Sequence, residues 1–353
     1  MFVLNHRYLL VLLLAVLTAF ATGCIIKNKK TTATLLRTED AGIEQLKSEV
    51  DRYARVGSMR AKMYLRFEDN SFAQFGSKEV YREADGEIVI QRPANILMKV
   101  QVPVIKSDVA QMTSNGEKFR VAILQDGGDG RYKKFVIGTN DADYSKLQQN
   151  LDQAKGDVAA AKTLNAFANL RPQHFTDAML VRPIDQNNLY TQSTIYQIED
   201  EKSEDKKSVK SSVTRGYYLL DEYKRADNGD LKILRRFWFD RVGVVRLARQ
   251  QLFDVKGEIS SDIVYGREGD LSSTGEFKKL PLEIQVTRPQ EGYSMRLRYQ
   301  TPGDVMIGEV YPVTAFVLQN SWQLEEVDLD KKLQQLTAAQ PAASNSNTPA
   351  RIQ

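Results

Sequence analysis

Residue types that carry out chemistry are scarce in this chain of 353 residues. It has one cysteine, Cys24, and two histidines, His6 and His174, which excludes an internal disulfide and a cysteine-based zinc site. The segment Asp126–Gly130 is rich in aspartate and glycine, but it lacks the ligand spacing of an EF-hand and no P-loop lysine follows it. We also find no serine elbow. The sequence therefore predicts a protein that is not an enzyme and that needs no cofactor and no metal.

The overall composition is typical of a folded protein, and its charge balance does not indicate a strongly charged partner. Hydrophobic residues make up 42% of the chain and charged residues 27%, which is typical of a globular domain and not of a disordered or polytopic membrane chain. The 49 Lys and Arg against 45 Asp and Glu leave a net charge of +4. No basic block stands out, so we expect no nucleic-acid partner.

The cysteine follows an N-terminal stretch with the pattern of a signal peptide. Arg7 precedes an apolar run from Leu9 to Ala21, which is shorter than the ~20 residues that cross a membrane. The run leads into Ala21-Thr22-Gly23-Cys24, which resembles the bacterial lipobox, where the cysteine is lipidated and becomes the new N-terminus. Residues 1–23 are thus predicted to be removed.

An uncleaved anchor is the alternative interpretation. It would run from Tyr8 to Ile26, but Lys27, Lys29 and Lys30 follow it, which opposes the positive-inside rule. A lipidated Cys24 followed by a polar tether, residues 24–37, fits better. Because Ile25 and not Asp follows the cysteine, the resemblance implies a lipid anchor in the outer membrane, with the protein facing the periplasm.

The body of the chain predicts an α+β fold that is mainly β. Ile43, Leu46, Val50, Tyr53 and Val56 form the apolar stripe of one amphipathic helix that starts after Thr38 and stops at Gly57. From residue 58 to residue 318 the apolar period is mostly two, and Asn-Gly and Asp-Gly pairs mark tight hairpins. We expect about a dozen antiparallel strands, each with one apolar and one wet face.

The strands fall into two blocks separated by a helical insert. The apolar period of a helix returns between about 141 and 180. We find no linker that would separate two cores, so residues 38–330 are predicted to form a single domain. The last stretch, 331–353, ends in small polar residues and prolines and is predicted to be a disordered tail.

This order of anchor, helix, strands, insert and further strands resembles the LolA/LolB-like outer-membrane lipoprotein carrier superfamily. The runs Ile88–Pro93, Ile96–Val100 and Ser114–Phe119 look like that family's passage of strand, basic-proline turn, strand and polar-glycine hairpin. Phe316, Trp322 and Glu325–Leu329 look like its closing strand. The resemblance implies an open antiparallel half-barrel whose concave face is lidded by helices. It also implies a protein that binds a lipid or an acylated protein and not one that catalyses a reaction.

The resemblance makes the apolar positions of the concave face candidates for lining a ligand cavity. Core packing is the other interpretation of any one of them. The candidates are Met63, Leu65, Met98, Val100, Val121, Ile123, Leu282, Ile284, Met295 and Leu297.

Two hairpin tips are candidates for membrane contact, because apolar residues there would protrude; packing against the lid or against a partner is the alternative. These candidates are Phe72 and Phe75 on one tip and Val102 and Val104 on the other. Two classes of function remain open. The protein carries a hydrophobic ligand in envelope transport or sorting, or it is a scaffold or stress-sensing lipoprotein that uses the same fold to bind a periplasmic protein.

Overall fold

The computed structural model describes residues 33–69, 79–80, 83–102, 107–125, 130, 133–144, 147, 171–200 and 212–339. Cys24, Phe72, Phe75, Val104 and most of the Asp126–Gly130 segment lie outside these residues. The chain divides into two compact units, one up to Leu36 together with 197–215 and one with Arg37–Tyr196 and the residues from Gly216 onward. No helix in the described part of the chain is both long and apolar enough to cross a membrane.

The smaller unit is a short piece of sheet. Strand β1 (Thr34–Leu35) runs parallel to the start of β10 (Ser212–Arg225), with Thr34 opposite Val213. The backbone N–H of Leu36 continues the pairing with a 3.0 Å hydrogen bond to the carbonyl of Thr214. Arg215 and Glu199 form an ion pair at 3.4 Å.

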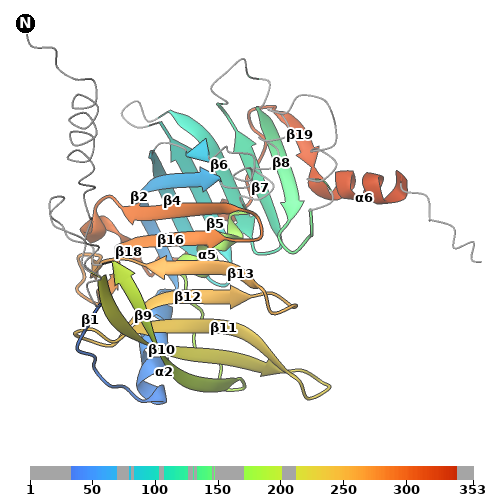
Figure 1. Cartoon of the computed structure of the whole chain (residues 1–353). Helices are drawn as coiled ribbons and strands as arrows, with labels where there is room; N and C mark the ends of the chain where they lie inside the picture. The colour runs from blue at the N-terminus through green and yellow to red at the C-terminus, as the bar shows by residue number, and fades with distance from the viewer. Residues whose placement is uncertain are drawn as a thin grey trace, which may run out of the picture. The chain divides into compact units, whose positions relative to one another are not determined.

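The larger unit is built on one long, twisted sheet (Figure 1). From β10 to β8 the neighbouring strands pair antiparallel, whereas β8 and β19 run parallel. In order of hydrogen-bonded neighbours, the strands are β9 (Leu189–Asp200), β10, β11 (Leu231–Asp240), β12 (Arg246–Phe253), β13 (Ile259–Tyr265), β16 (Glu283–Arg288), β17 (Tyr293–Tyr299), β2 (Ser58–Asp69), β4 (Ala84–Gln91), β5 (Asn95–Gln101), β6 (Asp108–Asn115), β7 (Lys118–Ile123), β8 (Lys134–Thr139) and β19 (Glu325–Asp328).

Strand β2 is the centre of the sheet. Two short strands, β18 (Met306–Ile307) and β3 (Glu79–Val80), extend the pairing along its two flanks. Among the described strands the two ends of the order, β9 and β19, do not pair with each other, so the sheet is an open half-barrel. The predicted fold class, mainly β with helices and an open antiparallel sheet, is confirmed.

The predicted alternation sets the two faces of the sheet. On β2, Met63 and Leu65 are buried whereas Tyr64 and Arg66 are exposed. This is what period-two side chains require when one face meets the core and the other meets water. The register then carries the apolar face from one block to the other, because Leu65 pairs with Leu297.

Two helices lie on the apolar face. Helix α2 (Ile43–Ala54) buries Leu46, Val50 and Tyr53, which share one helical face. Helix α5 (Gln173–Met179) packs against β5 and β16. Single turns of 3₁₀-helix occur at Pro302–Asp304 (η2) and Val313–Phe316 (η3).

The C-terminal segment differs from its prediction. Helix α6 (Leu329–Ala339) occupies the first residues of the stretch expected to be a disordered tail, and it packs on β8. Leu329 is buried, and Leu333 and Leu336 follow it at helical spacing and are half-buried, so one apolar stripe is enough to hold the helix. Figure 1 shows α6 leading away from the end of β19.

Candidate ligand-binding site

The ten predicted cavity residues come together on the inward face of the sheet. All of them belong to one hydrophobic cluster that extends over both strand blocks and under the two helices. Met63, Leu65, Met98, Val121, Ile123, Ile284, Met295 and Leu297 are buried, and Val100 and Leu282 are half-buried against them. Half-buried Val102, the described member of the membrane-contact set, lies just after β5. Its N–H donates to the carbonyl of Ser107 at 2.9 Å.

Helix α2 covers the C-terminal strand block. The hydroxyl of Tyr53 donates to the carbonyl of Leu247 at 3.1 Å, and the Tyr53 ring lies 5.4 Å from that of Tyr265. Burial raises the pKa of the Tyr53 hydroxyl well above its usual range, so it stays neutral and acts as a hydrogen-bond donor. The helix is thus fixed to the sheet by both ring packing and a buried hydrogen bond.

Helix α5 covers the middle of the sheet. Phe175, Ala178 and Met179 are buried, and the hydroxyl of Tyr265 donates to the carbonyl of Ala178 at 3.2 Å. His174 is also buried, with its Nδ1 2.6 Å from the hydroxyl of Tyr293. Burial lowers the pKa of His174 well below its usual value of 6.5, and the nearby charges of Arg288 and Arg171 lower it further.

The space between α2, α5 and this part of the sheet is nearly filled. One cavity there has a volume of about 10 Å³, which is room for about one water molecule. Its lining residues are Tyr53, Val56, Met59, Ala178, Met179, Val181, Tyr265, Leu271, Leu280, Pro281, Ile284 and Tyr299. This cavity is therefore too small to hold an acyl chain in the structure.

The segment after α5, residues 180–184, is bonded to the sheet and to α2 by side chains; we call it the strap. Arg92, in the turn between β4 and β5, donates to the carbonyls of Leu180 and Val181 at 3.4 and 2.7 Å. It also donates to the carbonyl of Ala54 at the end of α2, at 3.0 Å. Burial lowers the pKa of Arg92, and the charge of Arg182 adds to this. One guanidinium thus joins the C-terminal ends of both helices to the sheet.

A second arginine holds the next part of the strap. Arg235 on β11 donates to the carbonyls of Arg182 and Pro183 at 2.7 and 3.0 Å, and its Nε pairs with the carboxylate of Glu222. Both members of this ion pair are almost completely buried. The Ile184 N–H donates to Asp51 of α2 at 2.9 Å.

The carboxylate of Glu222 is the polar centre of this region. It also accepts hydrogen bonds from Asn188 at 2.7 Å and from the hydroxyl of Tyr190 at 2.9 Å. Burial alone would raise the pKa of Glu222, but the hydrogen bond and charge of Arg235 and the other two donors lower it below its usual value. Glu222 is therefore charged at neutral pH and holds both Arg235 and the residues that follow the strap.

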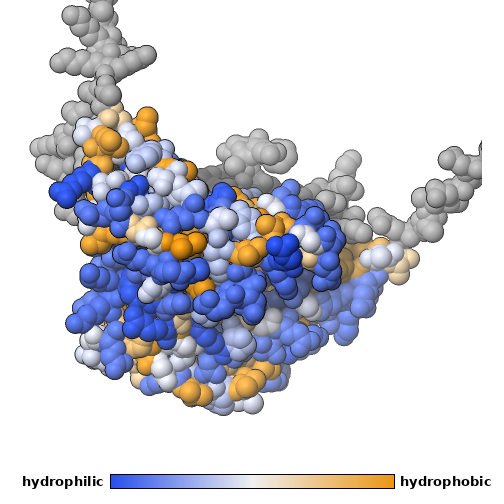
Figure 2. All heavy atoms as spheres, turned by 90° about the horizontal axis from the view of Figure 1, so that it is seen from below, coloured by the Kyte–Doolittle hydropathy of each residue, from blue (hydrophilic) through white to orange (hydrophobic). Residues whose placement is uncertain are grey.

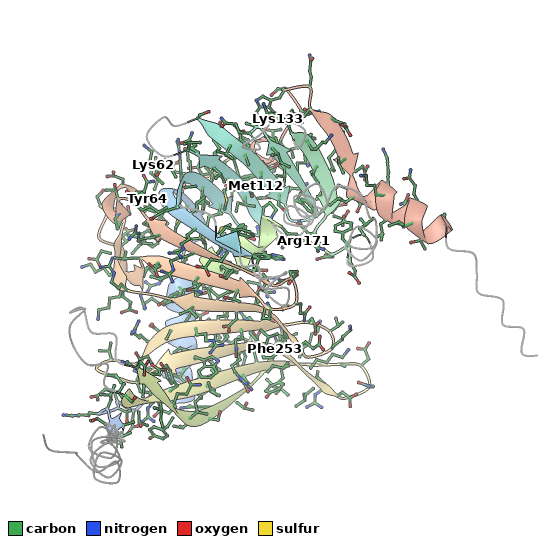
Figure 3. The ribbon with its side chains drawn as sticks, turned by 45° about the horizontal axis from the view of Figure 1, so that its top comes forward. Lys62, Tyr64, Met112, Lys133, Arg171 and Phe253 are labelled. Atoms are coloured by element: carbon green, nitrogen blue, oxygen red, sulfur yellow. The ribbon has the colours of Figure 1, made fainter. Side chains whose placement is uncertain are left out.

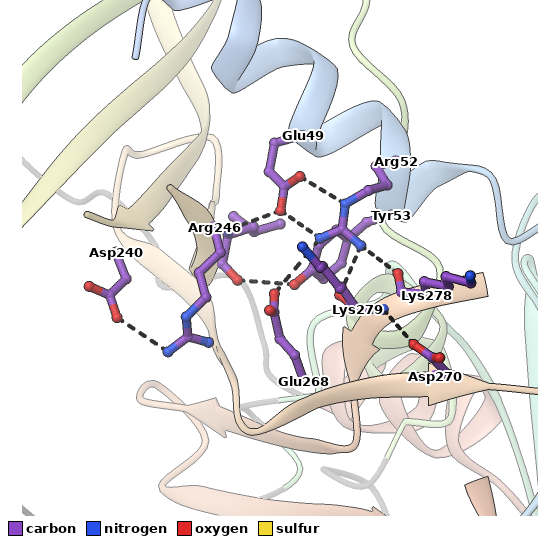
Figure 4. Close-up of polar contacts among 10 residues, drawn as sticks. Glu49, Arg52, Tyr53, Asp240, Arg246, Glu268, Asp270, Lys278 and Lys279 are labelled. Atoms are coloured by element: carbon purple, nitrogen blue, oxygen red, sulfur yellow. Dashed lines mark hydrogen bonds and ion pairs between the residues drawn. The ribbon is translucent and has the colours of Figure 1, made fainter. Parts of the chain in front are cut away.

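A third polar cluster lies beside the C-terminal half of α2 (Figure 4). Arg52 donates to the carbonyls of Lys278 and Lys279, both at 2.8 Å. Its Nε and Nη2 donate to the carboxylate of Glu49 at 2.8 and 2.6 Å. The Oε1 atom of Glu268 lies 3.8 Å from Nη2 of Arg52. Burial raises the pKa of the Glu268 carboxyl.

The outward face of the sheet is polar. Arginines stack on aromatic rings there, such as Arg249 over Trp238 and Arg298 over Tyr64, both at 4.9 Å. Figure 3 labels Lys62 and Tyr64 on this face of β2. The surface in Figure 2 is mostly hydrophilic, with scattered apolar residues. Within the described residues no group of three or more His, Cys, Asp or Glu side chains could hold a metal ion.

Sequence reasoning missed the polar attachments of the helices. Arg92 lies in the run Ile88–Pro93 that resembles the carrier superfamily, but nothing in the sequence of that run shows that its guanidinium reaches three backbone carbonyls. Arg235 had a clearer signal, because Ile233, Arg235, Phe237 and Phe239 alternate and place a charge on the inward face. A charge at such a position needs a partner, and the partner is Glu222 on the neighbouring strand.

The comparisons with known proteins give matches among solved structures alone. No family model and no curated protein matches this chain. A LolA superfamily protein from Nitrosomonas europaea is 11% identical, with 79% of this chain and 99% of that chain covered and a TM-score of 0.38. A DUF1329 family protein from Desulfovibrio piger is 10% identical, with 79% and 96% covered and a TM-score of 0.38.

A third similar structure is a Vibrio parahaemolyticus domain named as an outer membrane lipoprotein-sorting protein. It is 11% identical, with 76% of this chain and 93% of that chain covered and a TM-score of 0.37.

Proposed function

We propose that this protein binds acyl chains, from a lipid or a lipoprotein, between its sheet and helices α2 and α5. We further propose that it does so as a lipoprotein of the bacterial envelope. The observation that carries this proposal is the covering of the apolar face. One continuous hydrophobic cluster lies under two short helices and a strap. Arg92 and Arg235 attach these to the sheet by hydrogen bonds, and Asp51 of α2 bonds the strap to that helix.

Such a cover suits reversible opening. A hydrogen bond to a carbonyl can be replaced by one to water, so its net contribution is only about 1 kcal/mol, or about 1.5–3 when one partner is charged. The apolar surface uncovered by opening is unfavourable in water, but an acyl chain recovers about 0.8 kcal/mol for each CH₂ it buries. Opening therefore becomes favourable when a chain is present to replace the helices' contacts.

The proposed location rests on the N-terminal sequence. The apolar run that ends in Ala21-Thr22-Gly23-Cys24 supports a lipid on Cys24, and Ile25 supports the outer membrane. The predicted tether, residues 24–37, would then link a domain over 38–330 to the periplasmic face of that membrane, with its last part paired as β1 (Thr34–Leu35). Several acyl chains on one cysteine give durable anchoring, since a single chain binds only marginally.

The test measures binding directly. The mature chain, residues 24–353 with Cys24→Ser, is expressed without the predicted signal peptide so that no processing is needed, and it is purified without detergent. It is analysed by native mass spectrometry for bound lipid and then titrated with a fluorescent fatty acid. We expect co-purifying lipid, saturable probe binding, and reduced binding by Val100→Phe with a melting temperature close to that of the unsubstituted chain. A lipid-free protein that binds no probe would contradict the proposal.

A second function is favoured by one observation. The cavity beside α2 that the described residues line has a volume of about 10 Å³, which is typical of a packed core. A scaffold or stress-sensing lipoprotein that binds a periplasmic protein through its outward face would need no cavity. In that case Val100→Phe lowers the melting temperature, by overpacking that costs about 1–3 kcal/mol, and no probe binds.

A further inference from the structure

The β14–β15 hairpin, β14 (Glu268–Leu271) and β15 (Phe277–Pro281), is an extension of strands β13 and β16 that turns inward. Backbone hydrogen bonds continue from the sheet into the hairpin, from Gly266 to Glu283 at 2.8 Å and from Leu282 to Arg267 at 2.7 Å. The hairpin then forms a separate two-stranded sheet. Gly269 permits this turn, because a Cβ there would lie 2.7 Å from the Leu282 side chain.

Two leucines of this hairpin fill the interior beside α2. Leu271 and Leu280 are only 1% and 3% exposed. Both line the remaining cavity of about 10 Å³ together with Tyr53, Ile284 and Tyr299. The hairpin therefore places two aliphatic side chains where an open half-barrel would hold a ligand.

The other lining residues offer an apolar surface. The hydroxyls of the three lining tyrosines are each bonded within the protein, Tyr53 to Leu247, Tyr265 to Ala178 and Tyr299 to the sulfur of Met59 at 3.1 Å. They present their rings to the cavity. An unsubstituted acyl chain matches this lining, because it has no polar group that would be left without a partner.

The hairpin is fastened by one side chain of α2. Arg52 holds the carbonyls of Lys278 and Lys279 and is itself oriented by Glu49 (Figure 4). Lys279 adopts a φ of +54°, which is uncommon for a residue with a side chain. Arg52 thus bonds the backbone at the point where β15 departs from regular strand geometry.

We propose that the β14–β15 hairpin is an intramolecular occupant of an acyl-chain site, in which Leu271 and Leu280 are displaced when a ligand chain enters beneath α2. This inference rests on the proposed function and adds to it the place of binding and the element that controls entry. The hairpin competes with the ligand, so weakening its docking increases the apparent affinity for the ligand.

The experiment compares two buried leucines in the mature chain carrying Cys24→Ser. Leu271→Ala weakens the hairpin's docking, whereas Leu220→Ala removes an equally buried leucine from β10. With dodecanoate as ligand and native mass spectrometry as the readout, we expect Leu271→Ala to bind at least fivefold more tightly than the unsubstituted chain. Leu220→Ala should lower the melting temperature without tighter binding.

A second variant and a second measurement cover the case in which Leu271→Ala does not fold. Arg52→Gln releases the carbonyls of Lys278 and Lys279 and should also tighten dodecanoate binding. In the unsubstituted chain, dodecanoate should accelerate hydrogen exchange of residues 268–281. Binding with no change in exchange there, and with equal affinity in every variant, overturns the hairpin inference and leaves the carrier proposal intact. If no variant binds dodecanoate or the fluorescent probe, both proposals fail.

Discussion

Leu65 of β2 lies directly opposite Leu297 of β17. Two residues from opposite ends of the folded chain thus meet at the centre of the sheet, and both are buried. The two strand blocks are joined along this pair of strands, so the apolar face is continuous only if the pairing forms. The stability of the whole interior depends on this seam, here defined as the β2–β17 pairing.

The seam can be tested by a double-mutant cycle. Leu65→Ala and Leu297→Ala should each lower the free energy of unfolding by about 2–5 kcal/mol, the usual cost of emptying a core leucine site. Because the two side chains share one site, the double variant should lose less than the sum of the two. Urea unfolding of the four proteins measures the coupling. Strict additivity would mean that the two leucines do not meet.

The two faces of β2 should respond differently to the same new charge. Met63→Asp places an unpaired carboxylate in the core, which costs several kcal/mol, so we expect unfolding or aggregation. Arg66→Asp is the matched control on the outward face. Arg66→Asp breaks an exposed ion pair with Glu68 at 3.2 Å and places an opposite charge beside Arg296, so the net cost at this exposed site should be about 1 kcal/mol or less. Circular dichroism and melting curves compare the two, and equal tolerance would contradict the register.

The buried pair of Arg235 and Glu222 should be sensitive to the loss of one member. Arg235→Ala leaves Glu222 charged in the interior and frees two strap carbonyls, so we expect a loss of about 3–5 kcal/mol. Arg249→Ala, which breaks a more exposed pair with Asp262, should cost about 1 kcal/mol or less. Chemical denaturation distinguishes the two. A small effect of Arg235→Ala would show that the strap does not need this arginine.

His174 should make the stability fall with acid. Its pKa is held well below 6.5 in the folded protein by burial and by the charges of Arg288 and Arg171, and the hydroxyl of Tyr293 lies against its Nδ1. The unfolded chain takes up a proton below its ordinary pKa of 6.5, while the folded protein does not. Stability is therefore present above pH 6.5 and is lost as the pH falls below it.

The size of this effect follows from a single site. Lowering the pH from 7.5 to 5.5 should cost about 1.4 kcal/mol through His174 alone. His174→Gln should lack this contribution, while every other group titrates as before. Denaturation of both proteins at the two pH values gives the difference. If both proteins lost the same free energy of unfolding between pH 7.5 and pH 5.5, His174 would not be held neutral in the folded protein.

The anchor prediction concerns residues before the described part of the chain. Cys24→Ser should leave an unprocessed precursor in the producing bacterium, because the predicted lipidation and cleavage both need the thiol. Mass spectrometry of the membrane fraction measures the N-terminus and its acyl groups. A mature protein with an unmodified Cys24 would contradict the proposed lipid anchor and, with it, the proposed outer-membrane location.

Local sequence patterns were enough to place the strands and their faces, but not to show which strands pair with each other. Period-two alternation correctly placed Met63 and Leu65 inward, because a strand allows only two faces. It could not reveal the β2–β17 pairing, which depends on the path of the whole chain. The helix predicted to start after Thr38 begins at Ile43, because Thr38 forms a bridge with Val242 and the N–H of Glu39 bonds to Arg241.

The site shows the same division. The burial of the candidate residues follows from hydrophobicity and period, but of the ten only Ile284 lines the small cavity beneath α2. The fastening of the helices was not predicted, because Arg52, Arg92 and Arg235 reach backbone carbonyls, and every residue carries the same carbonyl. The inward turn of the β14–β15 hairpin was also missed, since it depends on the close approach of Gly269 to Leu282.

The β2–β17 seam also has a consequence for how the chain folds. Synthesis runs from the N-terminus, so β2 exists long before β17 and keeps one unpaired edge until nearly the whole domain is present. Pairing between such distant segments is slow, because a long loop must close before any contact is gained. An unpaired edge in the meantime is a template for aggregation. A chain interrupted before Tyr293 should therefore need a chaperone, whereas the complete chain closes its own centre.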